Sequence, residues 1–314
     1  MKFKVSFVGS GYMAAEHAKA FNDSNNFELV SVFSKTISNA KKFCSKFKMK
    51  NINSSIDDIY KKNKPDLLVI SITETELRKI LKKTLKYDWT ILVEKPCGIN
   101  LQDSKVINKL IKLNNGKIFV SLNRRYYSSS IFLKKKIKTI KDKIIIQIND
   151  NQDLNLAKSF NYNKKIIKNW MYANSIHNID LFNYFGRGKI TNVKNIYNYK
   201  TKNPFFVHSI LSFSSGDIGV YTATWNMPGY WSINISSKDI NYELKPIETL
   251  KIKTNKNRFD ISEYKISRWD IDFKPGLRMQ VDELNKYFQK HKYNLSTFND
   301  SFETQKLINK IYKI

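Results

Sequence analysis

The sequence predicts an α/β protein in two domains: a doubly wound parallel sheet at residues 1–122, then an α+β domain with a largely antiparallel sheet at 123–314. Three observations lead to this prediction. A glycine-containing turn follows the first apolar run, apolar runs then alternate with helical segments, and beyond residue 189 strand-like runs follow one another directly. The chain of 314 residues, 41% of them hydrophobic, is long enough for two cores.

Up to residue 122, apolar runs of strand length alternate with segments of helical periodicity. The first run, FKVSFV at 3–8, leads into the helical pattern AAEHAKAF, and the next run is FELVSVF at 27–33. Further runs are DLLVISIT at 66–73, WTILVE at 89–94 and KIFVSL at 117–122. Strands that alternate with helices pair in parallel through right-handed crossovers, so this pattern predicts the doubly wound sheet.

The turn after the first strand carries the pattern G-x-G-x-x-A. Gly9 permits a tight turn, Gly11 lets the backbone approach a pyrophosphate, and Ala14 is small enough for close packing of helix on strand. Tyr12 and Met13 lie between them, where the helix N-terminus offers backbone N–H groups to a phosphate. In the order strand, turn, helix, this pattern predicts a dinucleotide-binding site of the Rossmann type.

The residues after the second strand bear on which dinucleotide binds. A site for NAD usually has an acidic residue there, which binds the ribose hydroxyls. This chain has Ser34 and Lys35 instead, and an ammonium beside a hydroxyl suits a 2′-phosphate. We therefore predict NADP as the preferred cofactor and NAD as the alternative, since Lys35 can equally be one surface lysine among many. Thr73, at the end of its strand, is a further expected cofactor contact.

Three further motifs follow along the chain. They are EKP at 94–96, NRRY at 123–126 and HNID at 177–180. Together with the glycine-containing turn, their order and spacing resemble the Gfo/Idh/MocA family of NAD(P)-dependent oxidoreductases, which act mostly on sugars, polyols and their derivatives. The resemblance spans nearly the whole chain, and it implies a cofactor domain followed by a substrate domain.

Lys95 is the residue that we expect at the reacting oxygen. Oxidation of an alcohol sends a hydride to nicotinamide and requires a base for the hydroxyl proton. A lysine at the carboxyl end of a strand, where open α/β sheets bind ligands, can hold that oxygen by a charged hydrogen bond and stabilise negative charge on it. Pro96 stiffens the turn, and we expect Glu94 and Lys95 to contact the cofactor as well.

His177 is the second expected catalytic residue, because the resemblance implies a role in proton transfer. Asp180 lies on the same helical face and can accept a hydrogen bond from the imidazole. Family members commonly have an aspartate four residues before the histidine, but this chain has Ala173 there. Asn174 can orient substrate without taking a proton, and either water or Tyr172 can stand in for the carboxylate. A structural role for His177 in the core is the alternative.

The expected substrate contacts combine cations, aromatic rings and amides. Arginine can bind a phosphate or carboxylate at two points, and aromatic rings can stack on a sugar or a base. Each of these residues can equally belong to the core or to an interface. We expect an anionic sugar or a sugar nucleotide to contact Arg124, Arg125, Tyr126, Trp170, Asn174, His177, Asp180 and Trp225.

The second domain changes from helical to strand-rich sequence. A helix-like stretch at 128–140 leads to the strand KIIIQIND, and a loop-rich segment at 150–170 precedes the His177 helix. Strand-like runs follow from 189, with a hairpin expected at Gly216-Asp217. Two C-terminal helices are expected to pack back on the body. The resemblance implies that the uncovered sheet face forms a homodimer or homotetramer.

The net charge of +28, from 55 Lys+Arg against 27 Asp+Glu, raises the question of a nucleic-acid partner. The lysines are spread over the whole length, so we predict none, and the charge equally favours anionic small molecules. No signal peptide or membrane segment is apparent, and the two cysteines match no metal or redox spacing. We expect a cytoplasmic protein without membrane contact and without a metal site.

These observations predict an NAD(P)-dependent oxidoreductase that transfers a hydride between nicotinamide and a carbinol or carbonyl carbon of a sugar, sugar nucleotide or polyol. Two alternatives stay open. The replacement at Ala173 motivates a catalytically silent dinucleotide-binding sensor or scaffold of the same fold, and the charge motivates a nucleic-acid-binding protein.

Overall fold

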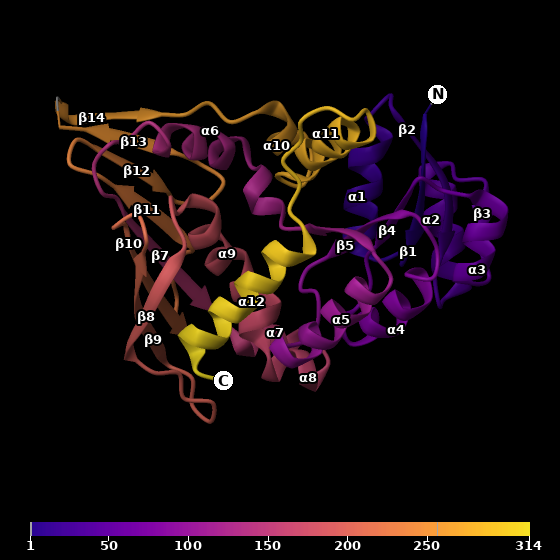
Figure 1. Cartoon of the computed structure of the whole chain (residues 1–314), viewed down its shortest axis with the longest axis horizontal. Helices are drawn as coiled ribbons and strands as arrows, with labels where there is room; N and C mark the ends of the chain where they lie inside the picture. The colour runs from indigo at the N-terminus through magenta and orange to yellow at the C-terminus, as the bar shows by residue number, and fades with distance from the viewer. Residues whose placement is uncertain (1, 256) are drawn as a thin grey trace. The chain divides into compact units, whose positions relative to one another are not determined.

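The computed structural model describes residues 2–255 and 257–314, which form two compact units. The first unit runs up to Asn123 and also takes in Ile271–Phe302, and the second comprises Arg124–Asp270 and Glu303–Ile314. One unit contains a parallel sheet and the other a mixed, largely antiparallel sheet, so the predicted fold class is confirmed (Figure 1). The assignment of cofactor to one part and substrate to the other stays a prediction.

The first unit is built on six parallel strands in the order β3-β2-β1-β4-β5-β6. The chain adds strands on one side of β1 and then reverses to add them on the other, beginning with β4. Such a reversal opens a crevice at the carboxyl ends of the two central strands. The strands are β1 (Phe3–Val8), β2 (Phe27–Phe33), β3 (Asn51–Ile52), β4 (Leu67–Ile70), β5 (Thr90–Glu94) and β6 (Lys117–Ser121).

Helices cover both faces of this sheet, as right-handed crossovers on either side of the reversal require. Figure 1 shows α4 and α5 next to each other, with α1 and α11 on the other side of the strands. Small residues of α1 lie in the core, which α11 completes with Leu277, Val281 and Leu284. The helices are α1 (Tyr12–Asn22), α2 (Ile37–Phe47), α3 (Ile56–Asp58), α4 (Glu74–Thr84), α5 (Leu101–Leu113) and α11 (Leu277–Phe288).

The second unit is built on eight strands in the order β14-β13-β12-β11-β7-β10-β9-β8. Only β7 and β10 pair in parallel; the other neighbours are antiparallel, and the predicted hairpin at Gly216-Asp217 joins β9 to β10. The strands are β7 (Ile145–Gln152), β8 (Ile190–Tyr197), β9 (Phe206–Phe213), β10 (Ile218–Trp225), β11 (Ser232–Ser236), β12 (Ile240–Leu244), β13 (Lys251–Thr254) and β14 (Asn257–Glu263).

Buried and exposed side chains alternate along β7, β9 and β10, because one face of the sheet is covered by helices. The helix α9 packs on β7, and eight of its ten residues are buried, including the polar residues Asn178 and Asp180. The helices here are α6 (Ser128–Ile137), α7 (Leu154–Ser159), α8 (Lys164–Lys168) and α9 (Ile176–Phe185), with α10 (Arg268–Asp272) and α12 (Phe298–Tyr312) crossing the division between the units.

Within the two described stretches, no helix is both long enough and apolar enough to cross a membrane. Nor do those residues bring three or more histidine, cysteine or acidic side chains together in a way that could hold a metal ion.

Gly9 is a position of the first unit that does not tolerate a side chain. Its φ is +104°, and a Cβ added there would lie 2.0 Å from the carbonyl oxygen of Ser71. We expect Gly9→Ala to lower the free energy of unfolding by about 3 kcal/mol or more, since strain and a backbone clash add together. Urea denaturation followed by circular dichroism measures the change.

Gly11→Ala is the matched control. A Cβ at Gly11 meets nothing within 4 Å, so this variant should lose only about 1 kcal/mol or less, the cost of alanine at a helix N-cap. Equal midpoints for the two variants would contradict the reading of Gly9.

Candidate functional site

The carboxyl ends of the parallel strands carry most of the expected cofactor residues of the first unit. Gly9 follows β1, Lys35 follows β2, Thr73 lies just after β4, and Glu94 ends β5. Because all six strands are parallel, these ends meet at one edge of the sheet. The fold therefore brings these predicted residues to one edge of the first unit.

The turn between β1 and α1 fits a dinucleotide pyrophosphate. Gly9 donates its N–H to the carbonyl of Phe33, 2.8 Å away, which ties the turn to β2. Gly11 is the N-cap of α1, no side chain caps the helix, and its first turn has no acidic residue. The open space at Gly11 leaves room for a phosphate beside these N–H groups. Ala14 is fully buried against the sheet, while Tyr12 is 68% exposed.

Lys35 does not stand alone at the end of β2. Its ammonium lies 2.5 Å from a carboxylate oxygen of Glu76 on α4, and Lys35 itself is largely exposed. The hydrogen bond from Lys35 lowers the pKa of the Glu76 carboxyl below its ordinary value. Ser34 accepts a hydrogen bond of 2.9 Å from the hydroxyl of Ser10. An acidic group is thus present beside Lys35. It comes from α4 and not from the end of β2, where a site for NAD usually has its acidic residue.

Glu94 is anchored by a residue that sequence reasoning missed. His17 Nε2 lies 2.6 Å from Glu94 Oε1, and His17 is 1% exposed. Burial by itself would raise the pKa of the Glu94 carboxyl, but the His17 hydrogen bond and the charge of Lys95 lower it below its ordinary value. The carboxylate therefore ties the end of β5 to α1 directly before the candidate catalytic lysine. Only spatial proximity reveals this pair, because its members are 77 residues apart.

Lys95 is half-buried and is joined to Pro96 by a cis peptide bond. The turn continues into Cys97, whose carbonyl accepts a hydrogen bond from the hydroxyl of Ser104 in α5. Asn100 caps α5 by accepting from the backbone N–H of Asp103. The backbone that follows Lys95 is thus fixed to the N-terminus of α5.

His177 lies near the start of α9, after a π-helical turn at Met171–Ser175. Its ring centroid is 6.4 Å from that of Trp231, and the guanidinium of Arg124 lies 4.7 Å from the centroid of the same tryptophan. Trp231 donates its indole N–H to the carbonyl of Asn151, 2.7 Å away. The structure thus groups two predicted residues, Arg124 and His177, around a tryptophan that the sequence analysis did not select.

Arg124 and Arg125 have different surroundings. Burial lowers the pKa of the Arg124 guanidinium, opposed by Tyr127, Glu248 and Asp150. Its Nε is buried without a hydrogen-bond partner among the described residues. Arg125, in contrast, donates from Nε and Nη2 to the two carboxylate oxygens of Asp180, each at 2.7 Å.

Asp180 therefore has a different partner from the one expected. Its Oδ2 and Oδ1 bind Arg125, and Oδ1 also accepts a hydrogen bond of 2.8 Å from Thr304 in α12. The expected role of Asp180 in orienting His177 stays a prediction. Helical periodicity correctly placed both residues on α9, but it could not indicate which arginine crosses to the carboxylate.

The remaining predicted substrate contacts differ in burial. Tyr126 and Trp225 are 2% and 1% exposed, so both rings are core residues in this structure and offer no face for stacking on a sugar. Trp170 is half-buried, packs 5.5 Å from the ring of Tyr162, and has an indole N–H without a hydrogen-bond partner in the described chain. Asn174 donates from Nδ2 to Gln152 Oε1, 2.8 Å away.

A buried carboxylate lies next to this group and was not anticipated. Asp150, in β7, is 1% exposed and accepts hydrogen bonds from Gln152, Asn178 and Tyr221. Burial raises the pKa of the Asp150 carboxyl, and these hydrogen bonds oppose the rise. The sequence contains one indication that Asp150 is buried: alternation along β7 places it on the same face as the buried residues Ile146 and Ile148.

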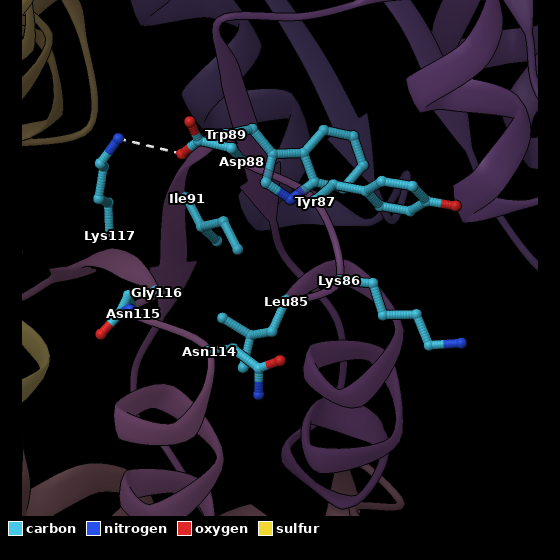
Figure 2. Close-up of a pocket in the computed structure, with 10 residues that line it drawn as sticks. All are labelled: Leu85, Lys86, Tyr87, Asp88, Trp89, Ile91, Asn114, Asn115, Gly116 and Lys117. Carbon is cyan, nitrogen blue, oxygen red and sulfur yellow. Dashed lines mark hydrogen bonds and ion pairs between the residues drawn. The ribbon is translucent and has the colours of Figure 1, made fainter.

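A pocket of about 380 Å³ lies at the other edge of the first sheet, where β5 and β6 begin (Figure 2). Figure 2 shows Tyr87 and Trp89 on one side of it and Lys117 paired with Asp88 at 3.0 Å. Open α/β sheets bind ligands at the carboxyl ends of their strands, so this amino-terminal pocket is separate from the candidate cofactor site. It is lined by Leu85, Lys86, Tyr87, Asp88, Trp89, Ile91, Asn114, Asn115, Gly116 and Lys117.

Residues 3–122 match the model of the Gfo/Idh/MocA family, described as an oxidoreductase family with an NAD-binding Rossmann fold. This matched segment contains both the glycine-containing turn and Glu94-Lys95-Pro96. In sequence, the likeness to this oxidoreductase family thus covers residues 3–122. The resemblance on which the sequence analysis relied is confirmed, and no curated protein matches the chain in sequence.

Solved structures extend the likeness to the whole chain. An NAD-binding oxidoreductase from Klebsiella pneumoniae superposes with a TM-score of 0.81 at 14% identity, covering 100% of this chain and 97% of its own. UDP-N-acetylglucosamine 3-dehydrogenase from Acidithiobacillus ferrooxidans gives 0.77 at 11% identity, with 100% and 97% covered. An oxidoreductase from Agrobacterium radiobacter in complex with NAD+, L-tartaric acid and magnesium gives 0.77 at 11% identity, with 100% and 96% covered. At these identities the likeness establishes the fold of both units.

The pair of His17 and Glu94 leads to a prediction about pH. Because the pKa of Glu94 is lower in the folded protein than its ordinary value of 4.5, ionised Glu94 stabilises the fold above that pH, and the contribution is lost as pH falls through the folded pKa. We expect Glu94→Gln to lower the free energy of unfolding by about 1–3 kcal/mol at pH 7 and by progressively less as the pH falls below 4.5. Urea denaturation at several pH values measures this difference.

Glu28→Gln in β2 is the control, because Glu28 is 45% exposed and lies 4.0 Å from Lys50. Its effect should stay within about 0.5 kcal/mol at neutral pH. A loss for Glu94→Gln that stays constant as the pH falls through the acid range would show that packing, and not the ionised carboxylate, accounts for the stability.

Proposed function

We propose that the protein is an NAD(P)-dependent oxidoreductase that transfers a hydride between nicotinamide and a carbinol or carbonyl carbon of a sugar, sugar nucleotide or polyol. One observation carries the proposal: within an NAD-binding Rossmann unit of an oxidoreductase family, Lys95 follows β5 at the carboxyl edge of the sheet. That edge is where open α/β sheets bind ligands. When bound, the nicotinamide supplies a carbon that accepts or gives the hydride.

Lys95 acts on the substrate oxygen in this proposal. Its ammonium donates a hydrogen bond to the hydroxyl or carbonyl oxygen at the reacting carbon and stabilises the negative charge that develops there. Glu94, held by His17, directly precedes Lys95 in sequence, and the positive charge of Lys95 helps to lower the pKa of the Glu94 carboxyl. The turn that follows Lys95 is tied to α5, which limits the motion of the lysine backbone.

His177 takes the hydroxyl proton in the oxidative direction and returns it in reduction. The proton leaves the substrate oxygen as the hydride leaves the adjacent carbon, so the substrate loses two electrons and two hydrogens in total. Ala173 supplies no second acid or base, and we propose that the imidazole alone exchanges the proton with solvent. Asn174 orients the substrate by hydrogen bonding.

The substrate carries an anionic group in this proposal. Arg124 is half-buried, forms no ion pair among the described residues, and has a buried Nε without a hydrogen-bond partner there. A partly buried guanidinium that is not paired with a carboxylate is stabilised when a phosphate or carboxylate binds to it. The relative from Acidithiobacillus ferrooxidans is named as acting on a sugar nucleotide, which supports the same substrate class here.

A catalytically silent sensor or scaffold is the second candidate, and Ala173 is the observation that favours it. A chain that binds nucleotide but exchanges no hydride with any substrate of the proposed classes would fit this alternative. A panel of sugars, sugar nucleotides and polyols, followed by NAD(P)H absorbance at 340 nm, separates the two candidates.

We also propose that the uncovered face of the second sheet forms a homodimer or homotetramer. Its outward positions on the three adjacent strands β7, β10 and β9 carry no lysine, arginine or acidic residue, although charged residues make up 26% of the chain. Charged groups are depleted from the centres of protein interfaces. These outward positions are Ile145, Gln147, Asn149 and Asn151 on β7, Phe206, His208, Ile210 and Ser212 on β9, and Ile218, Val220, Thr222 and Thr224 on β10.

Lys95→Met tests the proposed chemistry. We expect kcat to fall by about 1000-fold because the reacting oxygen loses its charged hydrogen bond, while the Kd for NAD(P)H changes less than about threefold. Turnover is followed at 340 nm and binding by nucleotide fluorescence. Lys82→Met, an exposed site on α4, is the control and should match the wild type. Turnover in Lys95→Met within about tenfold of the wild type would rule out this role.

Cofactor choice rests on the pair of Lys35 and Glu76, and we propose NADP as the preferred cofactor, with NAD as the alternative. A 2′-phosphate would compete with Glu76 for the ammonium of Lys35. Lys35→Ala should therefore weaken NADPH binding by about tenfold and leave NADH binding unchanged, because one charged hydrogen bond is lost.

Glu76→Gln is the complementary variant and should tighten NADPH binding, since Lys35 is then released from its partner. Fluorescence titrations with both nucleotides measure the four affinities. If Lys35→Ala lowers neither affinity, Lys35 is a surface lysine and NAD becomes the preferred assignment.

A further inference from the structure

Asp150 is a buried carboxylate on which three chains of hydrogen bonds converge in the second unit. The covered face of β7 begins with the apolar residues Ile146 and Ile148 and then presents Asp150 and Gln152, both at most 1% exposed. Continuing the apolar pattern would avoid the desolvation cost of a carboxylate at this position. The presence of a carboxylate at position 150, despite this cost, suggests that its hydrogen bonds have a specific role.

An ionised carboxylate can only accept hydrogen bonds, so each partner of Asp150 must donate. Gln152 donates from Nε2 at 2.5 Å and Asn178 from Nδ2 at 2.8 Å, both to Oδ1. Tyr221 donates its hydroxyl to Oδ2 at 2.6 Å. The direction of every bond that follows is determined by this first set.

The first chain leads to Asn174. Because Gln152 turns its Nε2 towards Asp150, its Oε1 is left to accept, and it accepts from Asn174 Nδ2 at 2.8 Å. The amide of Asn174 is thereby oriented with its nitrogen towards Gln152. Its Oδ1 is then the atom that remains to accept a hydrogen bond from another group.

The second chain leads to Ser175. Because Tyr221 gives its proton to Asp150, its oxygen is free to accept from the hydroxyl of Tyr312, 2.9 Å away. Tyr312 in turn lies 3.5 Å from the hydroxyl of Ser175. The third chain is the single bond to Asn178. Residues 174, 175 and 178 stand on both sides of His177 in sequence.

We propose that Asp150 is a positioning residue for His177 and for the substrate-facing oxygen of Asn174. Its carboxylate holds the three residues around His177 in one arrangement and selects the amide orientation in which Asn174 accepts. The site then favours a substrate that donates a hydroxyl or N–H proton to Asn174. This inference rests on the proposed function, and it assigns to a strand the orienting carboxylate that the helix lacks at Ala173.

Asp150→Asn tests the inference, because the amide preserves the shape and places an N–H group against donors. We expect kcat to fall by about 10–100-fold, the loss usual when a supporting partner of a site residue is removed, with the Kd for NAD(P)H unchanged. The control is Asp217→Asn. Asp217 is another buried carboxylate of the second unit, bound by Arg187 and by the backbone N–H of Ile144. It should lose stability but keep kcat within about threefold.

A second measurement needs no substrate. The chain has four histidines, so selective isotope labelling gives four imidazole signals, and His177→Gln identifies the one from His177. We expect this signal to shift in Asp150→Asn and to stay in place in Asp217→Asn, while the signal of His208 on β9 stays in both variants. A His177 signal that is the same in both aspartate variants would overturn the inference.

Gln152→Leu keeps the test decisive if Asp150→Asn does not fold. It removes the link to Asn174 and leaves Asp150 with Asn178 and Tyr221 as donors. We expect a fall in kcat of about tenfold, and an unchanged kcat would overturn the inference. If no substrate is turned over by the wild type but the His177 signal still shifts only in Asp150→Asn, the proposed function fails and the positioning role stands.

Discussion

The close approach of β1 and β4 at Gly9 is the constraint on which the first unit depends. The backbone N–H of Ser71 bonds to the carbonyl of Val8, and the carbonyl of Ser71 occupies the space that a Cβ of Gly9 would need. Chain reversal occurs between these two strands, so their carboxyl ends border the crevice where such sheets bind nucleotides. The absence of a side chain at Gly9 allows the strands to meet, and the open space at Gly11 leaves the N-terminus of α1 accessible.

Each unit has a carboxylate close in the chain or by hydrogen bond to a candidate catalytic residue, and the two carboxylates are stabilised differently. Glu94 directly precedes Lys95, and Asp150 binds Asn178, which directly follows His177. Glu94 receives a hydrogen bond from His17 and lies beside Lys95, so its pKa is lowered in spite of burial. Asp150 has only neutral donors bound to it, and burial raises its pKa. In the proposals above, one carboxylate therefore acts through its charge beside an ammonium, and the other through the direction of the hydrogen bonds that it accepts.

Local sequence patterns predicted the parts of the fold that are made by neighbouring residues. The glycine-containing turn, the alternation of strands with helices and the hairpin at Gly216-Asp217 all appear in the structure. The candidate site was predicted less completely. Arg124 and His177 do share a neighbour, Trp231, which was not predicted. Arg125 was expected to contact substrate, but in the structure its guanidinium is paired with Asp180. Tyr126 and Trp225 were also expected to contact substrate, but both rings are buried in the core.

The sequence by itself determined the class of both sheets, because backbone periodicity and turn chemistry act over a few residues. Its motifs also indicated the family whose model matches residues 3–122. Tertiary structure alone decided the partners of the charged groups. His17 meets Glu94 across 77 residues, and Tyr221 meets Asp150 across 71. Such pairs leave no local pattern, since a buried charge requires a partner but its spacing in sequence is set by the path of the whole chain.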